Sequence, residues 1–161
     1  PPPLLRRQRQ MCIRDRPTNT IGYLKNNEET EKALKDGWLL TGDLGYIDDE
    51  GYLFIVDRKK SLIIRGGENI STLEVENALD RHANILESCV CGIDDPKFGE
   101  IVGAYIYCNA DVSEEAIKEF LNESIAGYKV PEVFHISKDP LPRIATEKID
   151  RVGIKKILSS Q

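Results

Sequence analysis

The sequence contains no apolar run near the roughly 18–20 residues that a membrane-spanning helix needs. Its longest apolar runs, such as residues 53–56, have the length of a strand. The N-terminus is basic, but no apolar segment follows it, so a signal peptide is not predicted. We therefore expect no integral membrane segment.

Cysteine and histidine are scarce, with four and two residues among 161. Cys89 and Cys91 lie two apart in an apolar run, a spacing that places both on one face of a strand. A metal site or a disulfide is one interpretation. Because no CxxC pair or His cluster accompanies them, small buried hydrophobes are favoured. The sequence predicts no metal site and a reducing, cytoplasmic compartment.

Net positive charge is also lacking over most of the chain. Residues 1–17 hold five Arg and one Asp, so the remainder carries 17 basic and 26 acidic residues. An acidic body argues against a nucleic-acid groove, which needs clustered Lys and Arg. Residues 1–17 also lack an apolar period, so we predict a disordered or foreign segment, with a basic tether as the alternative.

The remaining chain alternates between strand and helix patterns. An acidic turn between two apolar runs predicts a β-hairpin over 45–53. Ser71 and Glu74 form a capping box that opens a helix. Further patterns predict a helix at 28–34, strands at 62–64, 85–93, 101–108 and 133–137, a helix after Ser113 and a helix at 151–158. This order predicts an α+β fold, with about three helices on a small mixed sheet that a β-hairpin precedes.

Four short motifs follow one another along the chain: TGDLG (41–45), DRKK (57–60), IRGGENIS (64–71) and LPRIATEKI (141–149). YKVP (128–131) precedes the last of them. Each is weak alone, but in this order and spacing they resemble the adenylate-forming superfamily. That superfamily includes acyl-CoA synthetases, luciferases and peptide-synthetase adenylation domains. The resemblance runs from about Ile21 to the end, and the run 63–70 is similar to fatty-acid-like acyl-CoA ligases.

The resemblance implies that Lys148 is the catalytic lysine of acyl-adenylate formation. In that step a carboxylate attacks the α-phosphate of ATP, and negative charge gathers on oxygens. A positioned cation stabilises such charge, and lysine supplies a point charge on a flexible stem. The alternative for Lys148 is an ordinary exposed lysine.

The same resemblance assigns nucleotide contacts to Asp43 and Arg58. Asp43 would accept hydrogen bonds from the two ribose hydroxyls of ATP, and Arg58 would bond ribose and phosphate oxygens. The alternatives are a turn-forming Asp at the end of a strand and a weak surface ion pair.

Lys60 matches the hinge position of the superfamily. Residues 18–60 would then be the C-terminal edge of a large adenylation domain, and 61–161 the mobile C-terminal domain. One rotation would present the lysine for adenylation, and the other would present Gly66 and Gly67 for thioester formation. Glycine lets the backbone approach a thin ligand such as the pantetheine arm of CoA; a plain turn is the alternative.

One departure concerns Glu147, because the superfamily normally has glycine directly before its lysine. A carboxylate there adds bulk and competes with phosphate for the Lys148 ammonium. Thr72, where the superfamily often has Pro, is a tolerable residue at a helix start.

The sequence also lacks a Ser/Thr/Gly-rich phosphate loop and an acyl pocket. We therefore expect a C-terminal part of an ATP-dependent acyl-CoA ligase, inactive alone, whose partners are CoA, a fatty-acid-like carboxylic acid and the missing large domain. ATP/AMP and CoA are the expected cofactors, with Mg²⁺ held by residues outside this chain. The alternative is a catalytically degenerate or free-standing binding module, which Glu147 favours.

Overall fold

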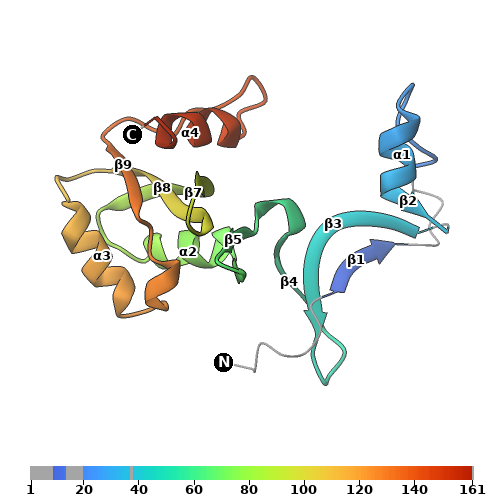
Figure 1. Cartoon of the computed structure of the whole chain (residues 1–161), viewed down its shortest axis with the longest axis horizontal. Coiled ribbons are helices and arrows are strands. Elements are labelled where there is room, and N and C mark those ends of the chain that lie inside the picture. Colours follow the sequence, from blue (N-terminus) through green and yellow to red (C-terminus); the bar gives the residue numbers. More distant parts are fainter. Residues whose placement is uncertain (1–8, 14–19, 37, 161) are drawn as a thin grey trace. The chain divides into compact units, whose positions relative to one another are not determined.

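The computed structural model of the chain describes residues 9–13, 20–36 and 38–160. The chain divides into two compact units between Lys60 and Ser61. Each unit has its own sheet, and Figure 1 shows the elements of both. The predicted α+β class is confirmed.

The first unit is built around the long strand β3 (Trp38–Ile47). β3 pairs antiparallel with β1 (Arg9–Ile13), β2 (Leu34–Lys35) and β4 (Leu53–Arg58). The predicted hairpin is present as β3 and β4, and its turn is closed by Asp48, whose Oδ1 accepts from the amides of Glu50 and Tyr52. Helix α1 (Asn27–Ala33) begins at Asn26, whose side chain accepts from the Glu29 amide.

Arg9–Ile13, within the segment that the sequence predicts to be disordered or foreign, form strand β1. A strand edge offers a row of unpaired backbone groups, and any extended backbone can pair with it whatever its side chains. A composition-based prediction does not detect such pairing. The rest of residues 1–17 lies outside the described residues.

The second unit contains a five-stranded mixed sheet. Its strands are β5 (Ile63–Arg65), β6 (Glu68–Ile70), β7 (Ile85–Asp95), β8 (Gly99–Cys108) and β9 (Val133–Ser137). β8 is central, antiparallel to β5 and β7 and parallel to β9. β7 and β8 are longer than predicted because Asp95 closes a tight turn, accepting from the amides of Lys97 and Phe98.

Three helices cover this sheet: α2 (Thr72–Leu79), α3 (Glu114–Asn122) and α4 (Arg151–Leu158). Short 3-10 turns occur at Lys59–Ser61 and Gly127–Lys129. α4 lies on the opposite side of the sheet from α2 and α3 (Figure 1). The helix count agrees with the sequence prediction.

Strand alternation explains this arrangement of helices. From Glu87 onward, even-numbered strand residues such as Val90 and Val102 pack in one hydrophobic cluster with α2 and α3. Odd-numbered ones such as Cys89 and Ile93 pack in a second cluster with α4. Each fully buried Leu, Ile or Val stabilises the fold by about 1.5–3 kcal/mol. The sheet is therefore fixed by apolar packing on both faces.

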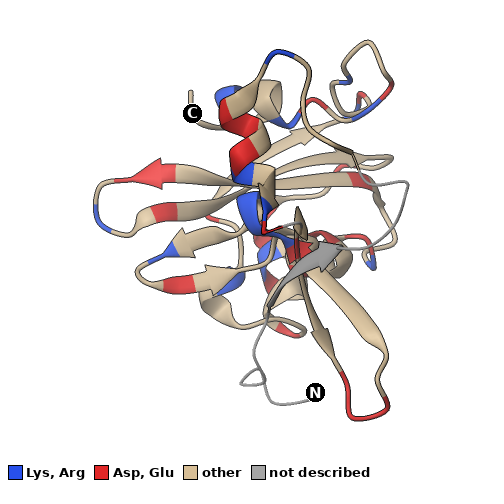
Figure 2. Ribbon diagram, turned by 90° about the vertical axis from the view of Figure 1, so that its right-hand side faces the viewer, with Lys and Arg blue, Asp and Glu red and all other residues tan. Residues whose placement is uncertain are grey.

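Three further observations bear on predictions made from the sequence. Figure 2 shows Lys and Arg interspersed with Asp and Glu along the ribbon of the described residues. Among the described residues, no helix is both long and apolar enough to cross a membrane. Cys89 belongs to the α4 cluster and Cys91 packs against it, as the interpretation of small buried hydrophobes predicts.

Candidate functional site

Asp43 and Arg58 lie directly opposite each other in the β3–β4 register. The Arg58 Nε atom is 3.3 Å from Asp43 Oδ1. The Asp43 side chain is 20% exposed and that of Arg58 is 76% exposed, so this ion pair adds little stability. The structure thus brings the two predicted nucleotide residues together on one hairpin.

The local setting of Asp43 differs from the prediction. Asp43 was expected where a strand becomes a turn, but β3 runs through it from Trp38 to Ile47. Gly42 adopts a positive φ of 81° within the strand, which explains why TG followed by Asp resembles a turn signal. The turn-forming alternative for Asp43 is therefore wrong.

Lys60 lies in the 3-10 turn Lys59–Ser61, and the two compact units divide directly after it. A 3-10 turn is a common connector between elements. Movement about Lys60 stays a prediction.

Gly66 and Gly67 form the two-residue turn between β5 and β6, with Arg65 opposite Glu68. Their φ angles are +57° and +91°, the pair of positive values that a type I′ hairpin turn requires. A Cβ on Gly67 would meet no atom within 4 Å. Glycine is therefore required here by backbone conformation, and the turn keeps an open outer surface.

Cationic and aromatic side chains flank this glycine turn. The Arg65 guanidinium carbon lies 4.4 Å from the centre of the Phe98 ring, and Lys97 Nζ lies 4.8 Å from it. The Gly66 amide donates to the Phe98 carbonyl at 2.8 Å, and Arg65 Nη2 is 2.5 Å from Glu132 Oε1. The sequence did not single out this group, because its members are far apart along the chain.

Lys148 lies in a small hairpin between β9 and α4. The Ile144 amide donates to the Lys148 carbonyl, and the Glu147 amide donates to the Ile144 carbonyl, both at 2.9 Å. This pattern is that of a three-residue hairpin loop, Ala145 to Glu147, whose last residue ordinarily adopts a left-handed conformation. Lys148 directly follows that residue and is exposed.

Glu147 has a φ of +62°, one of three positive values at non-glycine residues in the described chain. Glycine is the usual residue at this point of a three-residue hairpin loop, because a Cβ is disfavoured there. This backbone requirement gives a physical reason for the glycine that the superfamily places before its lysine. The sequence argument considered only bulk and charge at this position.

The lysine hairpin is attached to β7. The backbones of Arg143 and Ile149 pair in an isolated antiparallel β-bridge. The Arg143 side chain forms an ion pair with Glu87 of β7. Glu87 lies eight residues before Asp95, the end of β7, so these two points are about 26 Å apart along the strand. The glycine turn bonds Phe98, just beyond Asp95. The lysine hairpin and the glycine turn are thus attached at opposite ends of the β7–β8 pair.

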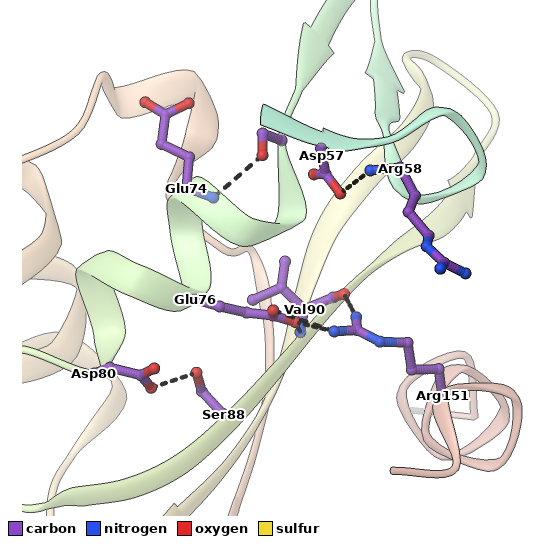
Figure 3. A network of polar contacts seen from close by, with 9 residues as sticks. Asp57, Arg58, Glu74, Glu76, Asp80, Ser88, Val90 and Arg151 are labelled. Carbon is purple, nitrogen blue, oxygen red and sulfur yellow. Dashed lines mark hydrogen bonds and ion pairs between the residues drawn. The ribbon is translucent and has the colours of Figure 1, made fainter. Parts of the chain in front are cut away.

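A second attachment joins α2, β7 and α4, and Figure 3 shows it. The buried Glu76 carboxylate accepts from the Val90 amide at 2.8 Å and pairs with Arg151 Nη2 at 3.0 Å. Arg151 Nη1 donates to the Val90 carbonyl at 3.2 Å. Since β7 is an edge strand, these bonds satisfy backbone groups that would otherwise be open to pairing.

The predicted cap of α2 by Ser71 is present. Ser71 accepts from the Glu74 amide as predicted. The Glu74 carboxylate binds Lys129 Nζ at 2.6 and 2.7 Å. The YKVP segment is thereby tied to the first turn of α2, a contact that the sequence did not indicate.

Three comparisons with known proteins agree on a relationship. Residues 74–148 match the AMP-binding enzyme C-terminal domain family. A 2-succinylbenzoate–CoA ligase of Bacillus licheniformis is 47% identical over 135 residues, which are 84% of this chain and 28% of that protein. The Bacillus subtilis o-succinylbenzoate CoA synthetase, solved with an acyl-adenylate intermediate, is 39% identical with a TM-score of 0.77, over 84% of this chain and 28% of that one.

A fatty acyl CoA synthetase of Mycobacterium tuberculosis is also similar, at 38% identity and a TM-score of 0.64, over 87% of this chain and 28% of that one. The expectation of the fatty-acid-like branch is nevertheless corrected. Curated relatives at 47% and 44% identity are 2-succinylbenzoate–CoA ligases, whose acid is aromatic. The chain spans about 28% of the length of these curated relatives.

Proposed function

We propose that the chain, whose residues 74–148 match the AMP-binding enzyme C-terminal domain family, works within an AMP-forming acid–CoA ligase of the adenylate-forming superfamily. Two reactions would follow each other. A carboxylic acid and ATP give an acyl-adenylate and pyrophosphate, and the acyl-adenylate and CoA then give acyl-CoA and AMP.

We propose that a larger N-terminal body supplies the rest of the active site. β4 supports this: Leu53, Phe54 and Ile55 are successive residues that point to alternate faces, and all three are about half exposed. Both faces of this strand therefore carry exposed apolar side chains, and exposed apolar surface is typical of a contact with another body. In this proposal residues 18–60 belong to that body, and the 161-residue chain alone does not turn over.

In the first reaction Lys148 would stabilise the charge that develops between carboxylate and α-phosphate. The observation that carries this role is the hairpin geometry, in which Lys148 is exposed beside a fixed turn and its ammonium has no ion-pair partner among the described residues. An unpaired ammonium on a rigid support can bind an approaching anion without first breaking an existing contact. Asp43 would hold the ribose hydroxyls, and Arg58 would bond ribose and phosphate oxygens.

In the second reaction the Gly66–Gly67 turn would lie along the pantetheine arm of CoA. Its lack of side chains leaves space for a thin ligand. The attachment of the two loops at opposite ends of the β7–β8 pair supports separate use, because a single orientation of the domain cannot present both to one point. Rotation at Lys60 would exchange them.

We propose an aromatic acid of the 2-succinylbenzoate kind as the substrate, by analogy with the curated relatives.

Mg²⁺ is implied for the complete enzyme by the resemblance. Among the described residues there is no group of three or more His, Cys, Asp or Glu side chains that could hold it. No step is therefore assigned to a metal here, and a cytoplasmic location stays a prediction.

The test is a chimera in which residues 20–161 replace the matching segment of the Bacillus licheniformis ligase. ATP–pyrophosphate exchange is measured with 2-succinylbenzoate, for the chimera and for its Lys148→Ala variant. Exchange that falls at least about 100-fold in the variant supports the proposal, since loss of one charge-stabilising group costs that much. Exchange that persists unchanged would contradict the role of Lys148.

Glu147 favours a second candidate, a catalytically degenerate binding module. It has a positive φ, and its carboxylate is adjacent in sequence to Lys148. Absence of exchange in the chimera, with the parent Bacillus licheniformis ligase active in the same assay, would favour this candidate.

A further inference from the structure

Arg143 connects the lysine hairpin to the sheet through both ends of its guanidinium. Nη1 donates to the Glu147 carbonyl at 2.9 Å, and Nη2 donates to the Glu87 carboxylate of β7. The Arg143 backbone also pairs with Ile149 on the returning arm of the hairpin. One residue therefore holds the hairpin to β7 and closes it upon itself.

The Glu147 carbonyl is the oxygen of the peptide that joins Glu147 to Lys148. A bond to this oxygen fixes the orientation of the peptide plane, and with it the direction in which the Lys148 side chain leaves the backbone. Glu147 adopts a φ of +62°, which a residue with a Cβ disfavours. The bond from Arg143 selects this conformation against its relaxed alternatives.

The Arg143 contact is partly shielded from water. The Arg143 and Glu87 side chains are 37% and 32% exposed. Hydrogen bonds between charged groups are shorter and stronger than neutral ones, and the planar guanidinium can serve two acceptors in fixed directions. An ammonium on a flexible stem cannot hold both acceptors with the same geometry.

The base of the loop is closed separately. The Asp150 amide donates to the Pro142 carbonyl at 2.8 Å, and Asp150 caps α4 by accepting from the Gly153 amide at 2.9 Å. Removing Arg143 should therefore loosen the tip of the hairpin while its base and α4 remain in place.

We propose that Arg143 is a positioning residue for Lys148: held by Glu87, it fixes the Glu147–Lys148 peptide and so the place where the ammonium is presented. This inference rests on the proposed role of Lys148 in adenylation. It adds two residues, Arg143 and Glu87, that would act on the reaction only through the lysine hairpin.

The functional test uses the chimera and measures the two reactions separately. Arg143→Ala should lower the rate of acyl-adenylate formation by about 100-fold, as a displacement of about 1 Å does at an active site. The KM for ATP should change little. The conversion of supplied acyl-adenylate and CoA into acyl-CoA should stay within about twofold, because Lys148 takes no part in it. Lys138→Ala is the matched control, since Lys138 forms an exposed ion pair with Asp111 outside the hairpin.

A merely structural role for Arg143 makes a different prediction. Loss of folded protein would lower both reactions equally, and this result, like an unchanged adenylation rate, would overturn the inference. Arg143→Lys should recover less than half of the lost rate, because an ammonium group cannot donate to both acceptors with the geometry of the guanidinium. Failure of the proposed function has a different signature. In that case ATP–pyrophosphate exchange would be the same in the unmodified chimera and in its Lys148→Ala variant.

A second readout needs no activity. Amide hydrogen exchange of the Ile144 and Glu147 amides, both bonded inside the hairpin, is compared in the 161-residue chain and its Arg143→Ala variant. Exchange at these two amides should accelerate at least about tenfold, while the Gly153 amide at the cap of α4 stays unchanged. Equal protection in both proteins would overturn the inference even if the chimera were inactive.

Discussion

Glu147→Gly should stabilise the chain and raise its activity, although glycine usually destabilises proteins. The φ of Glu147 is +62°. A left-handed conformation costs a residue with a Cβ about 1–2 kcal/mol, whereas glycine adopts it freely. Glycine in turn loses more backbone entropy on folding, by about 0.5–1 kcal/mol. The midpoints of these two ranges leave a gain of about 0.75 kcal/mol in the free energy of unfolding.

Three further variants separate backbone strain from charge. Glu147→Ala and Glu147→Gln remove the carboxylate but keep a Cβ, so they should leave stability near that of the parent chain. Glu147→Asn should lie between, because asparagine tolerates the left-handed region. For a unit of about 100 residues, 1 kcal/mol corresponds to about 4 °C in Tm.

The assay is thermal unfolding followed by far-ultraviolet circular dichroism. Fluorescence of Trp38, the one tryptophan, reports on the first unit alone and should not change. The reasoning is refuted if Gly and Ala at position 147 give equal Tm values. In the chimera, the adenylation rate of Glu147→Gly should also exceed that of Glu147→Gln. The glycine variant removes both the backbone strain and the carboxylate, whereas the glutamine variant removes only the carboxylate.

Three other predictions concern stability and reactivity. Glu74→Gln should cost about 1–3 kcal/mol in denaturant unfolding, because it leaves the Lys129 ammonium, whose side chain is only 11% exposed, without its partner, whereas Glu114→Gln, at an exposed pair, should cost less than about 0.5 kcal/mol. Ser71→Ala should cost about 1 kcal/mol through loss of the α2 cap, and an unchanged denaturation midpoint would refute that cap. Burial raises the pKa of Cys89 to about 12 and that of Cys91 to about 11. Both thiols should therefore resist alkylation at pH 8.5 until the chain unfolds, and since they hold their protons more tightly when folded, stability should fall as pH rises from about 9 toward 11.

Local sequence patterns predicted much of the second unit. β9 and α4 have the predicted bounds, because an alternating run and an amphipathic run are both recorded in neighbouring residues. The glycine turn was also located from neighbouring residues. The two positive φ angles of Gly66 and Gly67 explain why glycine is needed there. The edge pairing of β1 was missed because strand pairing joins residues distant in sequence.

The contacts that hold the candidate site were not predicted. The pairs Glu74–Lys129, Glu87–Arg143 and Glu76–Arg151 join residues 55, 56 and 75 positions apart. A single sequence does not show which residues so far apart along the chain come into contact. The motif around Lys148 was recognised from its order and spacing, but the strain at Glu147 appears only once the hairpin is seen.

The central claim is that the lysine hairpin and the glycine turn serve different reactions. In the chimera, acyl-adenylate formation and thioester formation from supplied acyl-adenylate are measured for Lys148→Ala and Gly67→Ala. The account predicts reciprocal losses: Lys148→Ala loses the first reaction and keeps the second, and Gly67→Ala does the opposite. If both variants lose the same reaction, or lose both equally, the two loops do not act separately and the account is wrong.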